Sequence, residues 1–251
     1  MASVGPTQRN APSVLGRAFA VLDAFGAADG RSLSLSAIAR RAGLPKSTAH
    51  RIVAQLLDWG ALSRDGDLLR LGPRLFELGT LGAQTRDLRE AAMPAMQVLY
   101  AATRETVHLG AREDTDVLYV EKLHGHRPSG ASTRLGGRMP LRSTGLGKAI
   151  LAFSPVAVVD AALATPVVTP TVHTVTDPVA LRAELDEIRR TGVAFDRGET
   201  LTQVACAAAP IVAPGGLAVG ALSITAPVAR FDAHRFATAV RSGAVAVSRA
   251  L

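Results

Sequence analysis

The sequence predicts a two-domain α+β protein with an N-terminal winged helix-turn-helix, a linker helix and a larger domain built on an antiparallel sheet. Three observations predict it. Two amphipathic helical segments are separated by only three residues, and an Asp-Gly-Asp turn between two short alternating runs follows them directly. After residue 104, five strand-like runs alternate with helices, with strands predicted at 106–111, 117–123, 193–196, 204–212 and 217–225 and helices at 145–153, 178–192 and near 233–250. At 251 residues, the chain is long enough to bury more than one core.

Each helix of the first domain, residues 12–74, begins at a serine. Ser13 precedes the first helix, Ser34 or Ser36 the second, and Ser47 is expected to cap the third. Glycines follow the second and third helices and end them. The third helix turns a stripe of apolar side chains toward the core, namely Ala49, Ile52, Val53, Leu56 and Leu57.

A hairpin directly after the third helix is expected to form the wing. The runs 61–64 and 68–71 flank the Asp-Gly-Asp turn, a strong hairpin signal. Residues 75–92 follow as a linker helix. We expect a new helix to begin at Pro94, because proline inside a helix costs ~3 kcal/mol. Residues 93–251 form the second domain.

The overall composition is that of a folded protein without a membrane span. Hydrophobic residues make up 48% and charged residues 20% of the chain, and no run approaches the ~18 apolar residues that a membrane helix needs. Residues 1–11 have no apolar signal-peptide core and are predicted to be a disordered tail. A single cysteine excludes an internal disulfide and suits a cytoplasmic protein.

A basic corner between the second and third helices predicts DNA binding. Residues 1–78 carry 10 Lys/Arg and 6 Asp/Glu, which is more than half of the net charge of +7. A recognition helix enters the major groove with its N-terminal residues first, where hydroxyls suit phosphates and arginine reaches base edges. A helical hairpin with a solvated basic face is the alternative, and the wing disfavours it. The predicted DNA-binding residues are Arg40, Arg41, Lys46, Ser47, Thr48, His50, Arg51 and Arg70.

The second domain has no recognisable nucleotide-binding or catalytic motif. Residues 145–150, GLGKAI, fail as a phosphate loop because Arg142 stands where the first glycine is needed. Their glycines either make a tight turn or open a helix whose free N–H groups hold a small anion. Cys206 lies in a buried-strand pattern, where core packing is the alternative to a nucleophile. Ser223 and Thr225 share one face of a strand, either facing solvent or forming part of a polar site.

Several motifs, taken in order, resemble those of the IclR family of transcriptional regulators. SLSAIARRAGLPKSTAHRIVAQLLDWGAL and LLRLGPRLFELG resemble its N-terminal half, and VHLGAR, VLYVEKL, MPLRSTGLGKAILA, TGVAFDRGE, VACAAAPI and ALSITAP its second half. The resemblance runs from Ser13 to the C-terminus. Ala61 and Leu69 depart from it, because the family usually has an aromatic residue and a tyrosine there, so the wing is expected to repack.

The resemblance implies a GAF-like second domain that binds an effector. In IclR-like domains a small carboxylate lies against a helix N-terminus, and polar groups from later strands complete the site. A family pair of acidic residues is reduced to Gly198-Glu199 here, and a small organic or aromatic acid is the expected effector. Asp196 is expected to accept a hydroxyl hydrogen bond, since facing an anion would be repulsive. The matching positions are Gly145 and Leu146 for backbone donors, Asp196, Cys206, Ser223 and Thr225 for side chains, and Leu135, Met139 and Val204 for apolar walls.

The chain is thus expected to be a regulator, either a repressor or an activator, and not an enzyme. A hydrolase or transferase using Cys206 or Asp196 beside an accessory DNA-binding module is the alternative, but the sequence shows no general base for it. A structural nucleoid protein would not need the second domain. No metal or other cofactor is expected, since His124 and His126 have no third ligand nearby.

The expected partners are a near-palindromic double-stranded DNA operator and further copies of the chain, as a homodimer or a dimer of dimers. Paired recognition helices of a dimer read two half-sites. No membrane partner is expected. The linker helix is the predicted dimer element, through the apolar positions Leu75, Leu78, Leu81 and Leu88.

Overall fold

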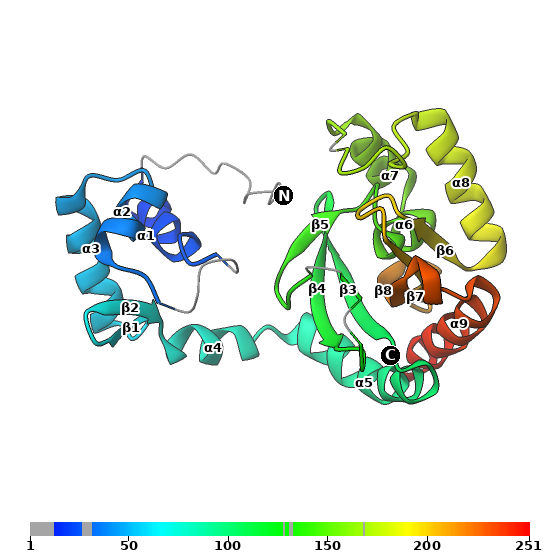
Figure 1. Ribbon diagram of the computed structural model, residues 1–251, viewed down its shortest axis with the longest axis horizontal. Helices are drawn as coiled ribbons and strands as arrows, with labels where there is room; N and C mark the ends of the chain where they lie inside the picture. Colours follow the sequence, from blue (N-terminus) through cyan, green and yellow to red (C-terminus); the bar gives the residue numbers. More distant parts are fainter. Residues whose placement is uncertain (1–12, 27–31, 128, 131–132, 168) are drawn as a thin grey trace. The chain divides into compact units, whose positions relative to one another are not determined.

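The structure is a computed structural model whose contacts divide the chain into two units between Arg86 and Asp87. Each unit has its own hydrophobic core (Figure 1). The predicted tail, residues 1–11, lies outside the described residues, and no described helix is long and apolar enough to cross a bilayer. The structure describes residues 13–26, 32–127, 129–130, 133–167 and 169–251.

Three helices pack around a small aliphatic core in the N-terminal unit. α1 (Val14–Asp23) begins at Ser13, whose Oγ accepts a hydrogen bond from the Gly16 N–H at 2.9 Å. α2 (Leu35–Arg41) is capped in the same way by Ser34. Both capping serines were therefore readable from the sequence. The core consists of Val21, Ala24, Leu33, Ile38, Ile52, Val53, Leu62 and Leu69.

α3 (Lys46–Asp58) begins one residue earlier than its predicted cap. Pro45 is the N-cap residue, and no side chain caps this helix, so the prediction that Ser47 caps it is wrong. The proline ring fixes the backbone φ of Pro45 at −56°, close to the helical value. The helix therefore starts after Pro45 without a capping hydroxyl group. Ser47 instead lies exposed in the first turn. The inward face is as predicted, with Ala49, Ile52 and Val53 buried.

β1 (Leu62–Asp65) and β2 (Leu68–Leu71) form the predicted wing. They pair antiparallel with Asp65 opposite Leu68, which leaves a two-residue turn. Gly66, the first residue of that turn, has a φ of 60°, which glycine adopts without strain. The two aliphatic residues that replace the aromatics of the family are both buried, as a repacked wing requires, namely Ala61 and Leu69.

The linker differs from the single helix predicted over 75–92. α4 (Pro73–Thr80) has Leu81 as its C-cap, and α5 (Ala83–Thr103) then continues through Pro94. The predicted break at Pro94 is wrong, because the buried stripe of α5 extends on both sides of the proline and its packing offsets the lost hydrogen bond. That stripe consists of Leu88, Ala92, Met96 and Leu99.

The apolar positions proposed for dimerisation therefore separate into two groups. Leu78 and Leu81, on α4 and at its end, are exposed. Leu88 on α5 is buried in the core of the C-terminal unit, so it does not present a surface to a second chain. α4 is the part of the linker that retains an uncovered apolar face.

The C-terminal unit contains a six-stranded antiparallel sheet in the order β5-β4-β3-β8-β7-β6. The five strands predicted from the sequence are present, and the short β5 was not predicted. The two-domain α+β class with an antiparallel sheet is therefore confirmed. The strands are β3 (Thr106–Glu113), β4 (Asp116–Leu123), β5 (Arg138–Pro140), β6 (Ala194–Arg197), β7 (Val204–Val212) and β8 (Ala218–Pro227).

Helices cover both faces of this sheet (Figure 1). α5 and α9 pack on one face, and α6, α7 and α8 form a second core on the other. A short 3₁₀ turn, η1, follows β8. The bounds are α6 (Gly145–Ala152), α7 (Val156–Ala164), α8 (Pro178–Thr191), η1 (Val228–Arg230) and α9 (Ala233–Ala250).

The alternation of side chains along β8 decides which residues meet α6. Leu222 and Ile224 belong to the core that α5 and α9 cover. Ser223 and Thr225 therefore point to the opposite face, the one that α6 covers. The predicted hydroxyl pair is buried rather than facing solvent.

Candidate functional site

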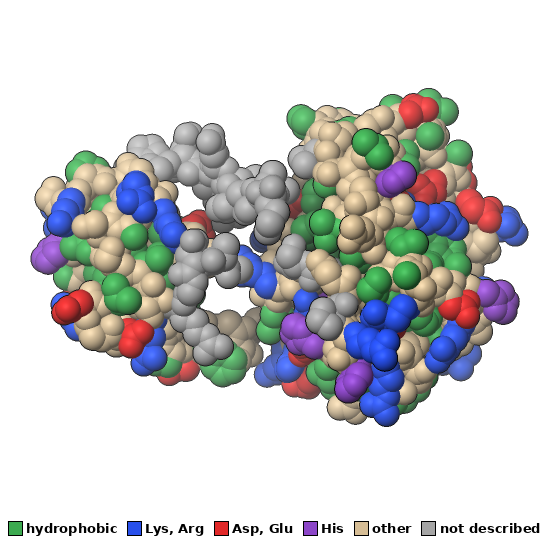
Figure 2. All heavy atoms as spheres, viewed as in Figure 1, with side chains coloured by type: hydrophobic (Ala, Val, Ile, Leu, Met, Phe, Trp, Pro, Cys, Tyr) green, Lys and Arg blue, Asp and Glu red, His purple; other side chains and the backbone are tan. Residues whose placement is uncertain are grey.

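The basic corner between α2 and α3 lies on the surface of the N-terminal unit, where Figure 2 shows Lys and Arg side chains. Because Ala49, Ile52 and Val53 are buried, the positions between them point outward. A helix N-terminus presents free N–H groups and a partial positive charge, which suits phosphate oxygens. The outward residues are Lys46, Ser47, His50 and Arg51, which are exposed, and Thr48, which is half-buried.

The remaining predicted DNA contacts come from α2 and the wing. Arg40 and Arg41 lie in the last turn of α2 and are exposed. Nη1 of Arg41 donates to the carbonyl oxygen of Ala24 at 3.1 Å, so this guanidinium also joins α2 to the end of α1. Arg70 lies exposed on β2. Contact of each residue with DNA stays a prediction.

A groove of about 310 Å³ runs between α1 and the outward face of α3. Thr48, Arg51 and Gln55 line it from α3. Arg17 lines it from α1, and its Nε is buried without a hydrogen-bond partner among the described residues. The sequence analysis missed Arg17, although it is the only charged residue in the first two turns of α1.

The predicted effector residues converge on the α6-facing side of the sheet. Asp196 on β6 lies opposite Cys206 on β7, which in turn lies opposite Thr225 on β8. Ser223 points to the same side, and all four side chains are buried. A Cβ on Gly145 at the start of α6 would lie 2.5 Å from Cys206 Sγ, so glycine permits this close approach. Five predicted positions thus form one cluster.

Asp196 is held by its own loop. Its carboxylate accepts hydrogen bonds from the Glu199 N–H at 2.7 Å and from the Thr200 hydroxyl at 2.5 Å. The expectation that Asp196 accepts a hydrogen bond from a hydroxyl group is confirmed by Thr200. Burial raises the pKa of Asp196, and these hydrogen bonds oppose the rise.

The Cys206 side chain is buried and packs in the interior of the C-terminal unit. Burial first, and then the charge of Asp196, raises the pKa of its thiol to about 12, although the N–H groups of Asp196 and Gly145 oppose the rise by hydrogen bonding to the sulfur. The nucleophilic form of cysteine is the thiolate. The sulfur is therefore protonated at neutral pH, which argues against the hydrolase or transferase alternative.

The predicted apolar walls are only partly assembled. Val204 is buried and Met139 is half-buried, and Leu146, predicted as a backbone donor, is buried in the first turn of α6. Leu135 is 57% exposed, so the structure does not bring it to the site as a wall. Its segment carries a run of small and charged residues that offers little apolar surface to pack against the sheet.

His108 lies on the same face of the sheet and was missed by the sequence analysis. Its Nδ1 is 3.3 Å from Thr225 Oγ1, and its Nε2 is 2.8 Å from Thr133 Oγ1. Burial, followed by the positive charges of Lys122 and His124, lowers the pKa of His108 to about 3, so the ring is neutral. Side chains alternate between the two faces of β3, and this alternation could have indicated that His108 points to the same face as the effector residues.

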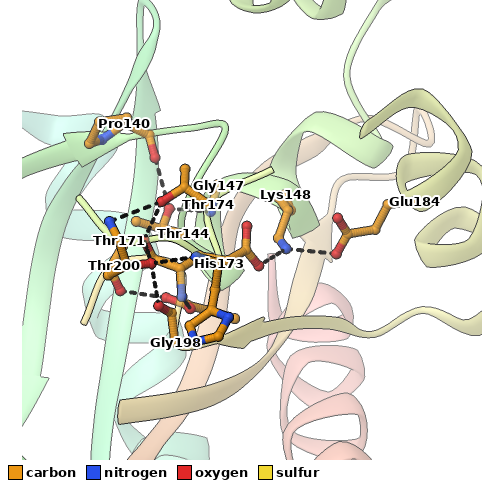
Figure 3. Close-up of polar contacts among 12 residues, drawn as sticks. Pro140, Thr144, Gly147, Lys148, Thr171, His173, Thr174, Glu184, Gly198 and Thr200 are labelled. Carbon is orange, nitrogen blue, oxygen red and sulfur yellow. Dashed lines mark hydrogen bonds and ion pairs between the residues drawn. The ribbon is translucent and has the colours of Figure 1, made fainter. Parts of the chain in front are cut away.

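Figure 3 shows a buried ion network beside the effector residues. Nζ of the fully buried Lys148 on α6 is 2.5 Å from Glu199 Oε1 and 2.6 Å from Glu184 Oε1 on α8. Burial alone would lower the pKa of Lys148, but the charges and hydrogen bonds of the two glutamates outweigh it and raise the pKa. The single carboxylate retained in the Gly198-Glu199 pair is therefore bound by α6.

The loop that carries Asp196 is also held from the α7–α8 connection (Figure 3). The Thr171 hydroxyl donates to the carbonyl oxygen of Gly198 at 2.7 Å, and the Thr174 hydroxyl donates to that of Glu199 at 2.7 Å. Contacts from Lys148 on α6 and from this connection thus position residues 196–200.

Comparison with known families accounts for both units. A family model described as the IclR helix-turn-helix domain matches residues 14–66, and one described as bacterial transcriptional regulator IclR C-terminal matches residues 81–249. The chain belongs to the IclR family. It is therefore a DNA-binding transcriptional regulator, and its relatives are named as regulators, not as enzymes.

Individual proteins resemble this IclR-family chain over most of its length. HTH-type transcriptional regulator KdgR of Dickeya chrysanthemi is 32% identical over 86% of this chain and 71% of its own length. The glycerol operon regulatory protein of Streptomyces griseus is 36% identical over 88% of this chain and 89% of its own. The crystal structure of an IclR homolog from Microbacterium hydrocarbonoxydans complexed with 4-hydroxybenzoate superposes with a TM-score of 0.88 at 33% identity, covering 95% of this chain and 99% of that one.

Proposed function

We propose that this IclR-family regulator binds a near-palindromic operator as a homodimer or a dimer of dimers, and that a small organic or aromatic acid changes its affinity for that operator. The winged helix-turn-helix through β2 supplies the DNA contacts, α4 and the start of α5 form the linker, and residues 87–251 form the effector unit. The exposed apolar face of α4 supports pairing through the linker. Because a transcription factor acts on the chromosome, we place it in the cytoplasm.

The cluster of buried polar side chains beside the N-terminus of α6 is the observation that carries the effector proposal. Cys206, Ser223 and Thr225 are uncharged in this environment. The first turn of α6 brings to the cluster the backbone N–H groups of Leu146 and of Gly145, which hydrogen-bonds to the Cys206 sulfur when no acid is bound. Such a combination suits the carboxylate of a small acid. The 4-hydroxybenzoate bound by the similar Microbacterium protein supports an acid of about that size.

The acid can regulate only through a difference in its affinity for DNA-competent and DNA-incompetent arrangements of the chain. Couplings of this kind amount to ~1–3 kcal/mol, or roughly 5- to 150-fold in operator affinity. The site is compatible with an acid that raises operator affinity and with one that lowers it. The same geometry therefore suits a repressor and an activator.

The test is fluorescence anisotropy of the purified chain on DNA from its own upstream region and on a scrambled duplex, at two salt concentrations. Specific recognition requires a preference of ~10³ or more for its own site and a steep loss of affinity with salt. A panel of organic acids that includes 4-hydroxybenzoate is then titrated into the complex. Equal binding to both duplexes with and without every acid would overturn the proposal.

Two variants separate the two halves of the proposal. Arg51→Ala should weaken operator binding and leave acid binding unchanged. Thr225→Val should leave operator binding intact and weaken the acid at least ~10-fold, because a hydrogen bond to a charged ligand is lost. If Thr225→Val responds to the acid like the wild type, the ligand lies elsewhere.

A further inference from the structure

A polar cavity of about 330 Å³ lies in the C-terminal unit, at the start of β3 and the end of β4. We call it the basic cavity. Its polar lining comes from strand residues and from the connection that follows β4. The lining residues used below are Thr106, Lys122, His124, Gly125, Arg127 and Gly130.

The basic cavity has cationic side chains without matching carboxylates. Lys122 and Arg127, the two cations of the lining, form no ion pair within the part of the chain that the structure describes. The two nearest acidic residues in sequence are bound elsewhere. Glu105 forms two hydrogen bonds with Arg230, at 2.9 and 3.0 Å. Glu121 is paired with Arg89 on α5 at 2.6 Å and also accepts a hydrogen bond from the Lys122 backbone N–H at 2.9 Å, but it forms no ion pair with the Lys122 ammonium. The positive charge is therefore not neutralised internally.

Lys122 has donors left for a ligand. Its Nζ donates to the carbonyl oxygen of Thr133 at 2.7 Å, and an ammonium group has three N–H donors. Burial lowers the pKa of Lys122, so this half-buried ammonium lacks stabilisation that an anion would supply. His124 and Arg127 are exposed at the mouth of the cavity and can turn toward the same anion.

The basic cavity borders the effector residues. Thr106, in its lining, lies opposite Thr225 across β3 and β8. A Cβ on Gly130 would lie 3.6 Å from a methyl group of Val204, at the start of β7. The neutral ring of His108 links the basic cavity to the effector residues. It contacts Thr225, and its pKa is lowered in part by the nearby Lys122 and His124.

We propose that the basic cavity is an anion site that takes a carboxylate or phosphate group. The cluster beside α6 contains the carboxylate of Asp196, whereas the basic cavity offers cations alone, so a second negative charge is favoured here. That charge comes either from a second acidic group of the effector, which rests on the proposed function, or from a separate inorganic anion, which does not.

The test is isothermal titration calorimetry on the full chain with three probes: inorganic phosphate, benzoate, and terephthalate, which adds a second carboxylate to benzoate. Lys122→Met and Arg127→Gln remove cations from the cavity, and Arg249→Gln removes an exposed cation from α9 as the matched control. Circular dichroism checks that each variant is folded. Arg127 is exposed, so its variant tests the cavity even if Lys122→Met unfolds.

A separate anion predicts that phosphate binds the wild type and is weakened at least ~10-fold by both cavity variants but not by Arg249→Gln. A diacid effector predicts that terephthalate binds more tightly than benzoate and that Arg127→Gln removes this advantage. The proposal is overturned if neither phosphate nor terephthalate distinguishes the cavity variants from the wild type. Binding of phosphate that depends on Arg127, with no acid affecting operator affinity, would retain the anion site while the effector proposal fails.

Discussion

The two units of this IclR-family chain present their functional residues in opposite ways. The DNA-binding unit displays Lys46, Ser47, His50 and Arg51 on the exposed face of a single helix. The effector unit buries its polar residues between a sheet and α6, and takes them from three strands and a helix. A duplex must reach its contacts from outside, whereas a small ligand is enclosed. Buried polar groups need internal partners, so stability and function are coupled in the second unit and nearly independent in the first.

The largest expected effect is that of Lys148→Met on the effector unit. Removing the ammonium leaves Glu199 buried without its charge partner, which should lower the free energy of unfolding by ~3–5 kcal/mol. Urea titration followed by circular dichroism measures the loss. Hydrogen exchange resolved by peptide should place it in residues 87–251 and not in the DNA-binding unit.

The matched control is Lys46→Met, which removes an exposed cation from α3. Its effect on stability should stay within ~0.5 kcal/mol, while it weakens operator binding. Adding Glu199→Leu to Lys148→Met should recover part of the lost stability, because the unpaired carboxylate is gone. Equal destabilisation by the two lysine variants would contradict the contrast between the units.

The second prediction concerns acid pH and His108. Its pKa is about 3 in the folded chain against an ordinary value of 6.5, so below pH 6.5 the unfolded chain binds a proton that the folded chain does not. The contribution of His108 therefore makes stability fall as pH falls from 6.5 toward 3, by about 2 kcal/mol over the first two pH units. Urea titrations of wild type and His108→Gln at pH 6.5 and 4.5 isolate this contribution. Equal losses in the two proteins would show that the ring is not held neutral.

The third prediction concerns Arg51 in the DNA-binding unit. Arg51→Ala should weaken operator binding by ~1–3 kcal/mol and relax base preference at one position of each half-site. Its thermal unfolding should match that of the wild type, because the side chain is exposed. Anisotropy on single-base variants of the operator measures the preference. A uniform loss on all sequences would assign Arg51 to phosphate contact instead.

The smallest effect is expected for Cys206→Ala. The exchange removes one buried sulfur beside Gly145 and should cost about 1 kcal/mol of stability or less, with operator binding retained. The native thiol should react with iodoacetamide at pH 8 far more slowly than in unfolded protein, because burial keeps it protonated. Fast alkylation of the folded chain would instead support Cys206 as a nucleophile.

Local patterns in the sequence were sufficient for much of the fold. The caps at Ser13 and Ser34, the glycine turn of the wing and the continuous strand β7 depend on neighbouring residues only, and each was found where expected. The five strands and the helices at α6, α8 and α9 followed from apolar alternation and spacing. α7 and the short β5 carried no comparable signal, because α7 has a single charged residue among its nine and so no polar face, and β5 has three residues.

The errors occur where packing or a competing local preference overrides the rule that was applied. A proline signals the end of a helix, yet the sheet buries Leu88 and Met96 on either side of Pro94 and keeps α5 continuous. Ser47 is a good capping residue, yet Pro45 starts α3. Local propensities differ by ~1–3 kcal/mol, and burial of several aliphatic side chains exceeds that.

For the candidate sites, the sequence by itself indicated most of the predicted DNA contacts, because Lys46, His50 and Arg51 and the hydroxyl residues beside them lie in the first turns of one helix and need no other element to place them. It also indicated Asp196, Cys206, Ser223 and Thr225, by resemblance to the family. Only the tertiary structure decided that His108 joins them, that Lys148 binds Glu199, and that Lys122 faces an unneutralised cavity. His108 and Thr225, like Lys148 and Glu199, are separated by tens of residues or more, and the register of the sheet and the packing of α6 on it, not sequence spacing, bring these side chains into contact.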